Sequence, residues 1–138
     1  MPKTTQIVIS EESKPGILAK VAATLGAAGV NIKAFSAPEV TQSGKGQLRL
    51  IVDHLEKARA VFKAEQIEFR EEPALVLSLE NKPGALSEVA QHLKQARINI
   101  ECAYLTPSRE GRRAIVIMTV SDTDKALAVL RDQSLDEI

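Results

Sequence analysis

The sequence predicts an α+β fold in which two ferredoxin-like β-α-β-β-α-β modules follow one another, each with an antiparallel sheet and both helices on one face. The chain matches itself at an offset of sixty-eight residues. Within each copy, short β-branched runs alternate with apolar residues at helical spacing. Composition agrees, because 44% of the 138 residues are apolar and 26% are charged, as in ordinary globular proteins.

The repeat is clearest around one turn and the strand that follows it. Lys14-Pro15-Gly16 coincides with Lys82-Pro83-Gly84, and Asn31-Ile32 coincides with Asn99-Ile100. Ten of the nineteen positions from 14 to 32 are identical in the two copies without a gap. Further matches follow in order along each copy, so we interpret the repeat as a duplication.

The first copy contains the elements of one module in order. Ser13 is expected to cap the first helix and Pro15 to occupy its first turn, while Gly29 ends that helix. Apolar residues at three- and four-residue steps mark the helices and form the face of each that is expected to be buried; they include Leu18, Val21 and Leu25 in the first copy and Leu86, Val89 and Leu93 in the second. The expected strands are 5–10, 31–37, 47–52 and 67–70, the expected helices are 17–28 and 55–62, and a turn is expected at 43–46.

The second copy repeats this order. Asn81 replaces Ser13 as the expected cap of its first helix, and Asp122 is expected to cap its second helix. The expected strands are 75–79, 98–105 and 115–120, the expected helices are 86–96 and 126–130, and a turn is expected at 108–112. Because the sequence stops at Ile138, a last strand is expected to be at best a stub.

Little sequence separates the two copies. Glu71-Glu72-Pro73 is the only punctuation before strand character resumes at Leu75. We therefore expect a first domain over residues 1–72 and a second domain over residues 73–138, coupled tightly rather than through a flexible linker.

Charge and composition argue against several classes of function. The 18 basic and 18 acidic residues leave a formal net charge of zero, so no basic field draws the protein to nucleic acid. No apolar run reaches the roughly 20 residues needed to cross a bilayer, and the N-terminus does not resemble a signal peptide. Cys102 is the only cysteine and is expected to be a buried, inert thiol. We therefore expect a cytoplasmic protein with no membrane partner and no cofactor.

The inventory of catalytic groups is small. His54 and His92 are the only histidines, and neither has a second ligand at metal spacing, so solvated or capping roles are favoured over a metal site. Arg109, Arg112 and Arg113 cluster at a hairpin loop, where a solvated tip is favoured over binding of an acidic ligand or partner. We therefore predict no catalytic residues and no enzymatic activity.

The repeated strand-to-helix turn is the main candidate binding site. Its glycine, Gly16 or Gly84, lets another group approach the backbone closely. The first helical N–H groups have no partner inside the helix, and the helix dipole adds partial positive charge, so a carboxylate is stabilised there. Lys14 and Lys82 can add charge. The alternative is that Pro-Gly only makes a tight turn, because duplication copies structural turns as well.

The same residues carry a family resemblance. The run Lys-Pro-Gly-x-Leu-x-x-Val-Ala-x-x-Leu, followed by Val-Asn-Ile or Ile-Asn-Ile, occurs in both copies and resembles the ACT domain. The chain looks most similar to free-standing tandem ACT proteins that lack a catalytic domain. The resemblance implies ferredoxin-like regulatory modules that pair and commonly bind amino acids at the interface between two modules.

The resemblance also implies which residues touch the ligand. The turn of one module and the start of the second strand in another would enclose it, with backbone amides on its carboxylate and an Asn side chain or a carbonyl on its ammonium. The implied ligand-binding residues are Lys14, Gly16, Ile17, Leu18, Asn31, Ile32, Lys82, Gly84, Ala85, Leu86, Asn99 and Ile100. Ser13 and Asn81 stand where the family often has an acidic residue, which argues against a direct acidic contact there. For Asn31 and Asn99, an ordinary turn role is the alternative.

The sequence therefore predicts a non-catalytic regulatory protein that binds a small ligand, an amino acid in the first instance, at interfaces between ACT-like modules. The alternative is an interaction module or regulatory subunit of a separate amino-acid biosynthetic enzyme, without its own ligand. A homodimer is expected, because exposed sheet edges or helix faces remain for a second copy once two modules have paired within one chain.

Overall fold

The computed structural model describes residues 3–12, 16–37, 45–108 and 110–131. In chain order, the elements are β1 (Lys3–Glu12), α1 (Ile17–Ala27), β2 (Ile32–Ser36), β3 (Lys45–Val52), α2 (Leu55–Ala64), β4 (Arg70–Glu80), α3 (Ala85–Gln95), β5 (Ile100–Pro107), β6 (Arg113–Val120) and α4 (Thr123–Val129). Part of the turn expected at 43–46 and the final residues, where a stub was expected, lie outside the described residues.

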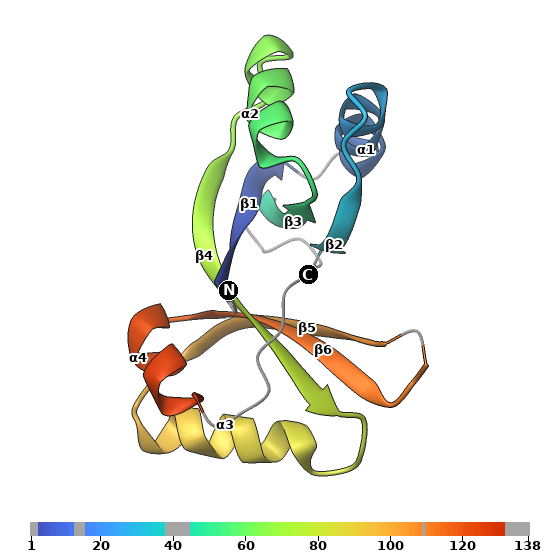
Figure 1. Ribbon diagram of the computed structural model, residues 1–138. Coiled ribbons are helices and arrows are strands. Elements are labelled where there is room, and N and C mark those ends of the chain that lie inside the picture. The colour runs from blue at the N-terminus through green and yellow to red at the C-terminus, as the bar shows by residue number, and fades with distance from the viewer. Residues whose placement is uncertain (1–2, 13–15, 38–44, 109, 132–138) are drawn as a thin grey trace. The chain divides into compact units, whose positions relative to one another are not determined.

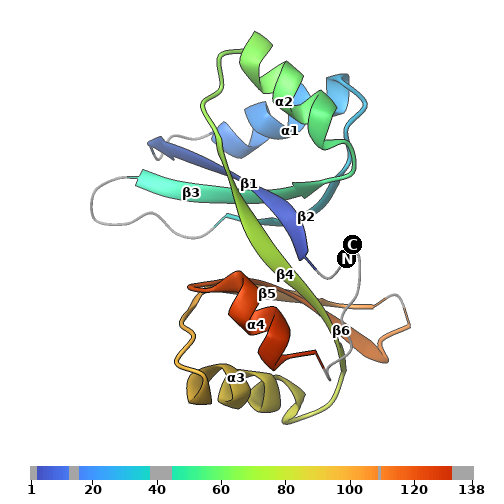
Figure 2. The ribbon, with the colours of Figure 1, turned by 60° about the vertical axis from the view of Figure 1, so that its left-hand side comes forward.

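The chain divides into two compact units. Thr5–Glu72 is called the first module here, and Pro73–Ile138 together with Met1–Thr4 is called the second module. Lys3 illustrates this grouping, since its Nζ lies 3.5 Å from Asp124 Oδ1. In each module two helices cover one face of an antiparallel sheet (Figure 1, Figure 2), which confirms the predicted α+β class.

In the first module the strand order is β2-β3-β1, and both pairs are antiparallel. Leu50 of β3 is opposite Ile7 on one side and Phe35 on the other. The helices bury the apolar positions that recur along their faces, as the sequence spacing predicts. The buried core is Ile7, Ile9, Val21, Leu25, Val30, Leu48, Leu50, Ala58, Phe62 and Ile67.

In the second module the strand order is β4-β6-β5, again with antiparallel pairs. Val116 of β6 is opposite Leu77 on one side and Leu105 on the other. The buried core is Leu75, Leu77, Leu79, Val89, Leu93, Ile98, Val116, Met118, Val120, Ala126 and Leu130.

The duplication extends to an irregularity of the backbone. The register of β2 against β3 shifts between Ile32 and Ala34, and that of β5 against β6 shifts between Ile100 and Cys102. These two places are sixty-eight residues apart, so both modules carry a bulge at the start of the same strand. Both bulges lie at the Asn-Ile segment that the sequence singled out.

One part of the expected strand pattern is wrong. The separate strands expected at 67–70 and 75–79 are replaced by a single strand, β4, which runs through Pro73. Proline removes one ladder donor, but its fixed φ is compatible with extended backbone. Pro73 therefore interrupts the pattern of hydrogen-bond donors without ending the strand.

Candidate functional site

The repeated turn takes the same unusual backbone conformation in both modules. Gly16 and Gly84 are the N-caps of α1 and α3, with φ of 94° and 88°. Side chains rarely adopt this left-handed region, which explains why glycine stands at both positions. Lys14, which the sequence places in the first turn, lies outside the described residues.

The expected asparagine cap is wrong. Neither α1 nor α3 has a side-chain hydrogen bond at its N-cap. Asn81 instead bridges to the β5–β6 hairpin, where its Nδ2 donates to Gly111 O at 2.8 Å and its backbone N–H donates to Arg112 O at 2.9 Å. The helix begins after Gly84, three residues beyond Asn81, so this side chain serves the hairpin instead. Ser13, the corresponding residue of the first module, lies outside the described residues.

The start of α3 therefore keeps free donors. Ala85 N–H donates to Lys82 O at 3.4 Å, and Glu88 N–H donates to Gly84 O at 3.2 Å. Leu86 and Ser87 lie between these two donors in the sequence. Within the described residues, their N–H groups have no intramolecular acceptor. Free N–H groups at a helix start are suited to an anion such as a carboxylate.

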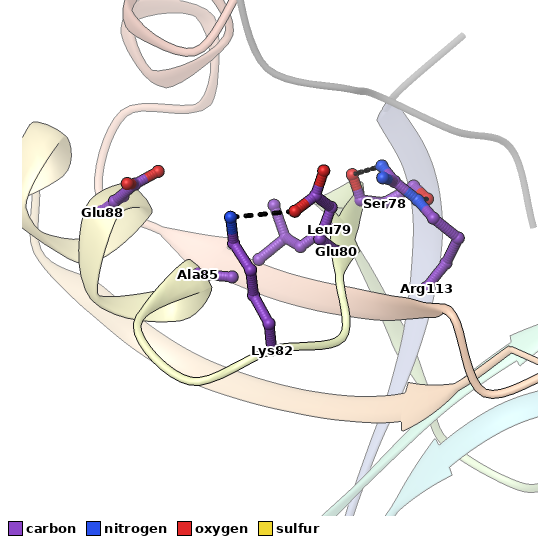
Figure 3. A pocket seen from close by; sticks show the side chains of 7 residues that line it. All are labelled: Ser78, Leu79, Glu80, Lys82, Ala85, Glu88 and Arg113. Carbon is purple, nitrogen blue, oxygen red and sulfur yellow. Dashed lines mark hydrogen bonds and ion pairs between the residues drawn. The ribbon is translucent and has the colours of Figure 1, made fainter.

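A pocket of about 250 Å³ opens beside this helix start (Figure 3). Its walls come from the end of β4, the turn, the first turn of α3 and the start of β6. The lining residues are Ser78, Leu79, Glu80, Lys82, Ala85, Glu88 and Arg113. Among the described residues, two acidic and two basic side chains thus share one small pocket, which makes it suitable for a ligand that carries both charges.

Two sets of contacts hold these charged groups in place. Lys82 Nζ lies 2.9 Å from Glu80 Oε2. Arg113 Nε donates to Ser78 Oγ at 3.0 Å, and its Nη2 donates to Ser78 O at 2.6 Å. The guanidinium is therefore fixed on β4 at the wall of the pocket.

The ion pair between Lys82 and Glu80 also shifts the pKa of both of its groups. The hydrogen bond from Lys82 and its charge lower the pKa of Glu80, against a smaller opposing effect of burial, and the charge of Arg113 adds to the lowering. In return, the hydrogen bond and charge of Glu80 raise the pKa of Lys82, and the charge of Glu88 raises it further. Both groups of the pair consequently remain charged at neutral pH.

The other half of the expected site lies in a different pocket of the second module. Asn99 and Ile100 line a pocket of about 440 Å³ together with Ala90, Lys94, Arg97 and Ile98. The backbone of Asn99 is held by Ser121, whose Oγ accepts from Asn99 N–H at 2.9 Å and whose N–H donates to Asn99 O at 2.9 Å. The Asn99 side chain is exposed and is left for other contacts.

The first module repeats that backbone arrangement. Asp53 Oδ1 accepts from Asn31 N–H at 2.9 Å, and Asp53 N–H donates to Asn31 O at 3.1 Å. Asn31 is exposed, and Ile32 begins β2 beside it. The turn residues and the Asn-Ile residues of the second module thus line separate pockets within that module.

Not every expected residue lines a pocket. Lys82 and Ala85 do, whereas Gly84 and Leu86 are absent from the lining of the pocket at the α3 start. Leu86 and its counterpart Leu18 are exposed to 44% and 36%, although the helical spacing placed Leu18 and Leu86 on the apolar stripes. Ile17 is partly buried against the first core.

Ser78, Glu80 and Glu88 are pocket residues that were not predicted from the sequence, and Arg113 was expected to have a solvated role. A signal existed for Glu88, because it follows Gly84 by one helical turn and must lie on the same side of the helix start. Nothing local connects Arg113 with this turn. Arg112 is exposed, and Arg109 lies outside the described residues.

The remaining candidates do not form a reactive centre in the described part of the chain. His54 is the N-cap of α2, with Nε2 3.7 Å from Asp53 Oδ2, and His92 is exposed in the last turn of α3. Cys102 is half-buried on β5, which is less burial than expected. Within the described residues, no group of three His, Cys, Asp or Glu side chains is placed to hold a metal ion. No described helix has both the length and the apolar character needed to span a membrane.

Residues 75–135 match the family model of the AHAS small subunit-like ACT domain. This match confirms the resemblance to the ACT family for the second module. No curated protein sequence matches the chain significantly.

Several solved structures have a similar fold. Protein BT0572 from Bacteroides thetaiotaomicron is 28% identical with a TM-score of 0.85, over 95% of this chain and 88% of that one. The ligand-free regulatory subunit of aspartate kinase from Thermus thermophilus is 20% identical with a TM-score of 0.64, over 94% and 91% of the two chains. Aspartate kinase from Clostridium acetobutylicum is 16% identical with a TM-score of 0.56, over 94% of this chain and 33% of that one. These likenesses show that the chain shares its fold with these three proteins.

Proposed function

From the ACT-like domain formed by residues 75–135, we propose that the chain is a non-catalytic, cytoplasmic regulatory protein that binds an amino acid at interfaces between ACT-like modules. The observation that carries this proposal is the pocket beside the α3 start, which holds two acidic and two basic side chains. An amino acid is a small ligand with one charge of each sign on adjacent groups. Such a ligand can satisfy both kinds of side chain without leaving a net charge in the pocket.

The ligand carboxylate is proposed to bind at the beginning of α3. The free N–H groups of Leu86 and Ser87 supply donors there, and Lys82 and Arg113 supply positive charge nearby. Because Arg113 is already held by Ser78, its guanidinium loses little freedom when a ligand binds.

A second module is proposed to close over the ligand. The exposed side chains of Asn31 and Asn99 have their backbones anchored and their amides available. The Asn-Ile segment of one module, at Ile32 or Ile100, would then face the turn of another. The separation of the two halves within one module supports a site that needs two modules.

Isothermal titration against each of the twenty amino acids tests the proposal. We expect at least one to bind to the folded protein. Arg113→Gln should weaken that binding about tenfold, the effect of losing one charge-assisted hydrogen bond. The neighbouring exposed residue provides a matched control, so Arg112→Gln should leave the affinity unchanged. Absence of heat for all twenty, with circular dichroism showing a folded protein, would contradict the proposal.

A second candidate is a regulatory subunit of a separate amino-acid biosynthetic enzyme, without a ligand of its own. It is favoured by the fold similarity to the regulatory subunit of aspartate kinase, which extends over 94% of this chain. Capture of such an enzyme from a lysate by the tagged chain, together with silent titrations, would favour this candidate over the first.

A further inference from the structure

We infer that Glu88 selects ligands that carry a protonated amino group and that it confines this selection to the second module. The inference rests on the proposed function and assigns the part of the ligand that the carboxylate-binding groups do not reach. The acidic residue that the family often places two positions before the proline is absent here, and Asn81 at that position is occupied with Gly111 O.

Glu88 has the free charge that this role requires. In Figure 3 the Lys82 ammonium lies between the carboxylates of Glu80 and Glu88. It pairs with Glu80 at 2.9 Å, whereas Glu88 has no ion pair within 4.0 Å among the described residues. Glu88 therefore stays available to a cation that enters the pocket. A ligand ammonium beside Glu88 would offset the charge of the ligand carboxylate, so the pocket residues and the bound ligand would together carry three carboxylates and three cations.

The first module has the opposite charge at the equivalent place. Lys20 is sixty-eight residues before Glu88, and its N–H donates to Gly16 O at 2.8 Å, as Glu88 N–H donates to Gly84 O. The two positions are thus equivalent in backbone structure as well as in sequence. An exposed lysine there repels an ammonium group.

Helix stability does not explain the difference. A negative side chain in the first turn stabilises any helix, and a positive one destabilises it slightly. Both α1 and α3 would gain from an acidic residue at this position, yet only α3 has one in its first turn. A difference in ligand preference between the modules accounts for the change of charge.

Titration calorimetry with matched ligand pairs tests the inference. Each of the twenty amino acids that binds is compared with the 2-hydroxy acid of the same side chain, which keeps the carboxylate and lacks the ammonium. We expect the wild type to bind one amino acid molecule per chain. Glu88→Gln should weaken amino-acid binding about tenfold and leave any binding of the hydroxy acid unchanged. The control Glu101→Gln removes an exposed carboxylate of the same module outside the pocket and should change neither.

Glu88→Lys places the first module's residue in the second module and should abolish amino-acid binding. Thermal unfolding of each variant verifies that it is folded. If Glu88→Gln binds the amino acid as tightly as the wild type, Glu88 does not select the ammonium. If Glu88→Lys still binds an amino acid at another site, the inference that selection of the amino group is confined to the second module is wrong. Silence of the wild type with all twenty amino acids would instead contradict the proposed function itself, and this inference with it.

Discussion

Glu72 belongs to a charged stretch that the sequence presents as punctuation between two copies, but its side chain is only 14% exposed. Its Oε1 accepts from Gln6 Nε2 at 2.9 Å and from Arg49 Nε at 3.1 Å, and its Oε2 accepts from Arg70 Nη1 at 2.9 Å. Arg49 is 13% exposed, so most of this network is shielded from water. A charged residue therefore stabilises the start of β4 from the inside of the first module.

The network makes stability depend on pH. Burial alone would raise the pKa of Glu72, but hydrogen bonds from Arg70, Arg49 and Gln6 outweigh it and lower the pKa below 4.5. Because the folded pKa lies below the unfolded one, this contribution is fully present above the unfolded pKa and is lost as the pH falls through the folded pKa. We expect Glu72→Gln to lower the free energy of unfolding by about 2 kcal/mol near neutral pH and to flatten its decline in acid.

Urea denaturation at several pH values measures this effect, and Glu71→Gln is the matched control. Glu71 accepts two hydrogen bonds from Arg59, at 2.9 and 2.6 Å, but that pair lies at the surface. Its loss should cost at most about 0.5 kcal/mol, because exposed ion pairs are screened by water. Equal losses in the two variants would show that burial of the Glu72 network adds nothing.

At the scale of elements, three helices end in the same way. Val30 N–H donates to Leu25 O, Ile67 N–H to Phe62 O and Ile98 N–H to Leu93 O, at 2.8 to 2.9 Å. The residue before each donor has a positive φ, and these residues are Gly29, Gln66 and Arg97. The sequence predicts the first of these helix ends from its glycine. The other two carry side chains that tolerate the left-handed region at a small cost, so no local signal marks them.

Replacing each of two glycines near the end of α1 by alanine should therefore change the stability of the protein in opposite directions. Gly26 lies within the helix, and a Cβ there meets no atom within 4 Å, so Gly26→Ala should stabilise the protein by about 0.5–1 kcal/mol. Gly29 has a φ of 75° with equal space around it, so Gly29→Ala should destabilise by about 1 kcal/mol.

Urea denaturation of both variants gives the comparison. Each substitution removes similar freedom from the unfolded chain, so the difference between them reports the native backbone conformation. Stabilisation by both would argue against the left-handed conformation of Gly29.

Side-chain caps at the helix starts are only partly predictable from this sequence. The expected cap of α4 is confirmed, because Asp122 Oδ1 accepts from Lys125 N–H at 3.1 Å. The expected cap of α3 is wrong, although Asn81 is as good a capping residue as Asp122. The difference arises because Gly84 lets the chain turn again before α3, while no such residue follows Asp122.

At the scale of the whole molecule, each module carries large apolar side chains that its own fold leaves in water. Phe35 on β2 is 51% exposed and Leu105 on β5 is 56% exposed. A contiguous apolar patch built around such side chains would mark a surface that binds a partner. A second copy of the chain is the partner we expect.

We predict that the protein is a homodimer, with twice the chain mass of 15.0 kDa in light scattering. Leu105→Glu should shift the protein toward the monomer, because a carboxylate would then be buried at the interface. Thr106→Glu changes the next, also exposed residue of the same strand and should leave the dimer intact. A wild type that is monomeric at all concentrations tested would contradict the prediction.

The sequence alone determined the features that depend on neighbours along the chain. Apolar spacing placed the helices and identified Val21, Leu25, Val89 and Leu93 as buried. The repeat predicted two similar modules. The Pro-Gly turn marked the beginnings of the first helix in each copy, because a left-handed backbone position requires glycine almost regardless of its surroundings.

Only the tertiary structure decided which distant groups meet. It joined two expected strands into β4, turned Asn81 toward a hairpin thirty residues away, and brought Arg113 to the same pocket as Glu80 and Glu88. Such encounters depend on strand register and helix placement, which many weak contacts determine together. The sequence pattern could therefore locate the turn, whereas the charges that surround it became visible only in the folded chain.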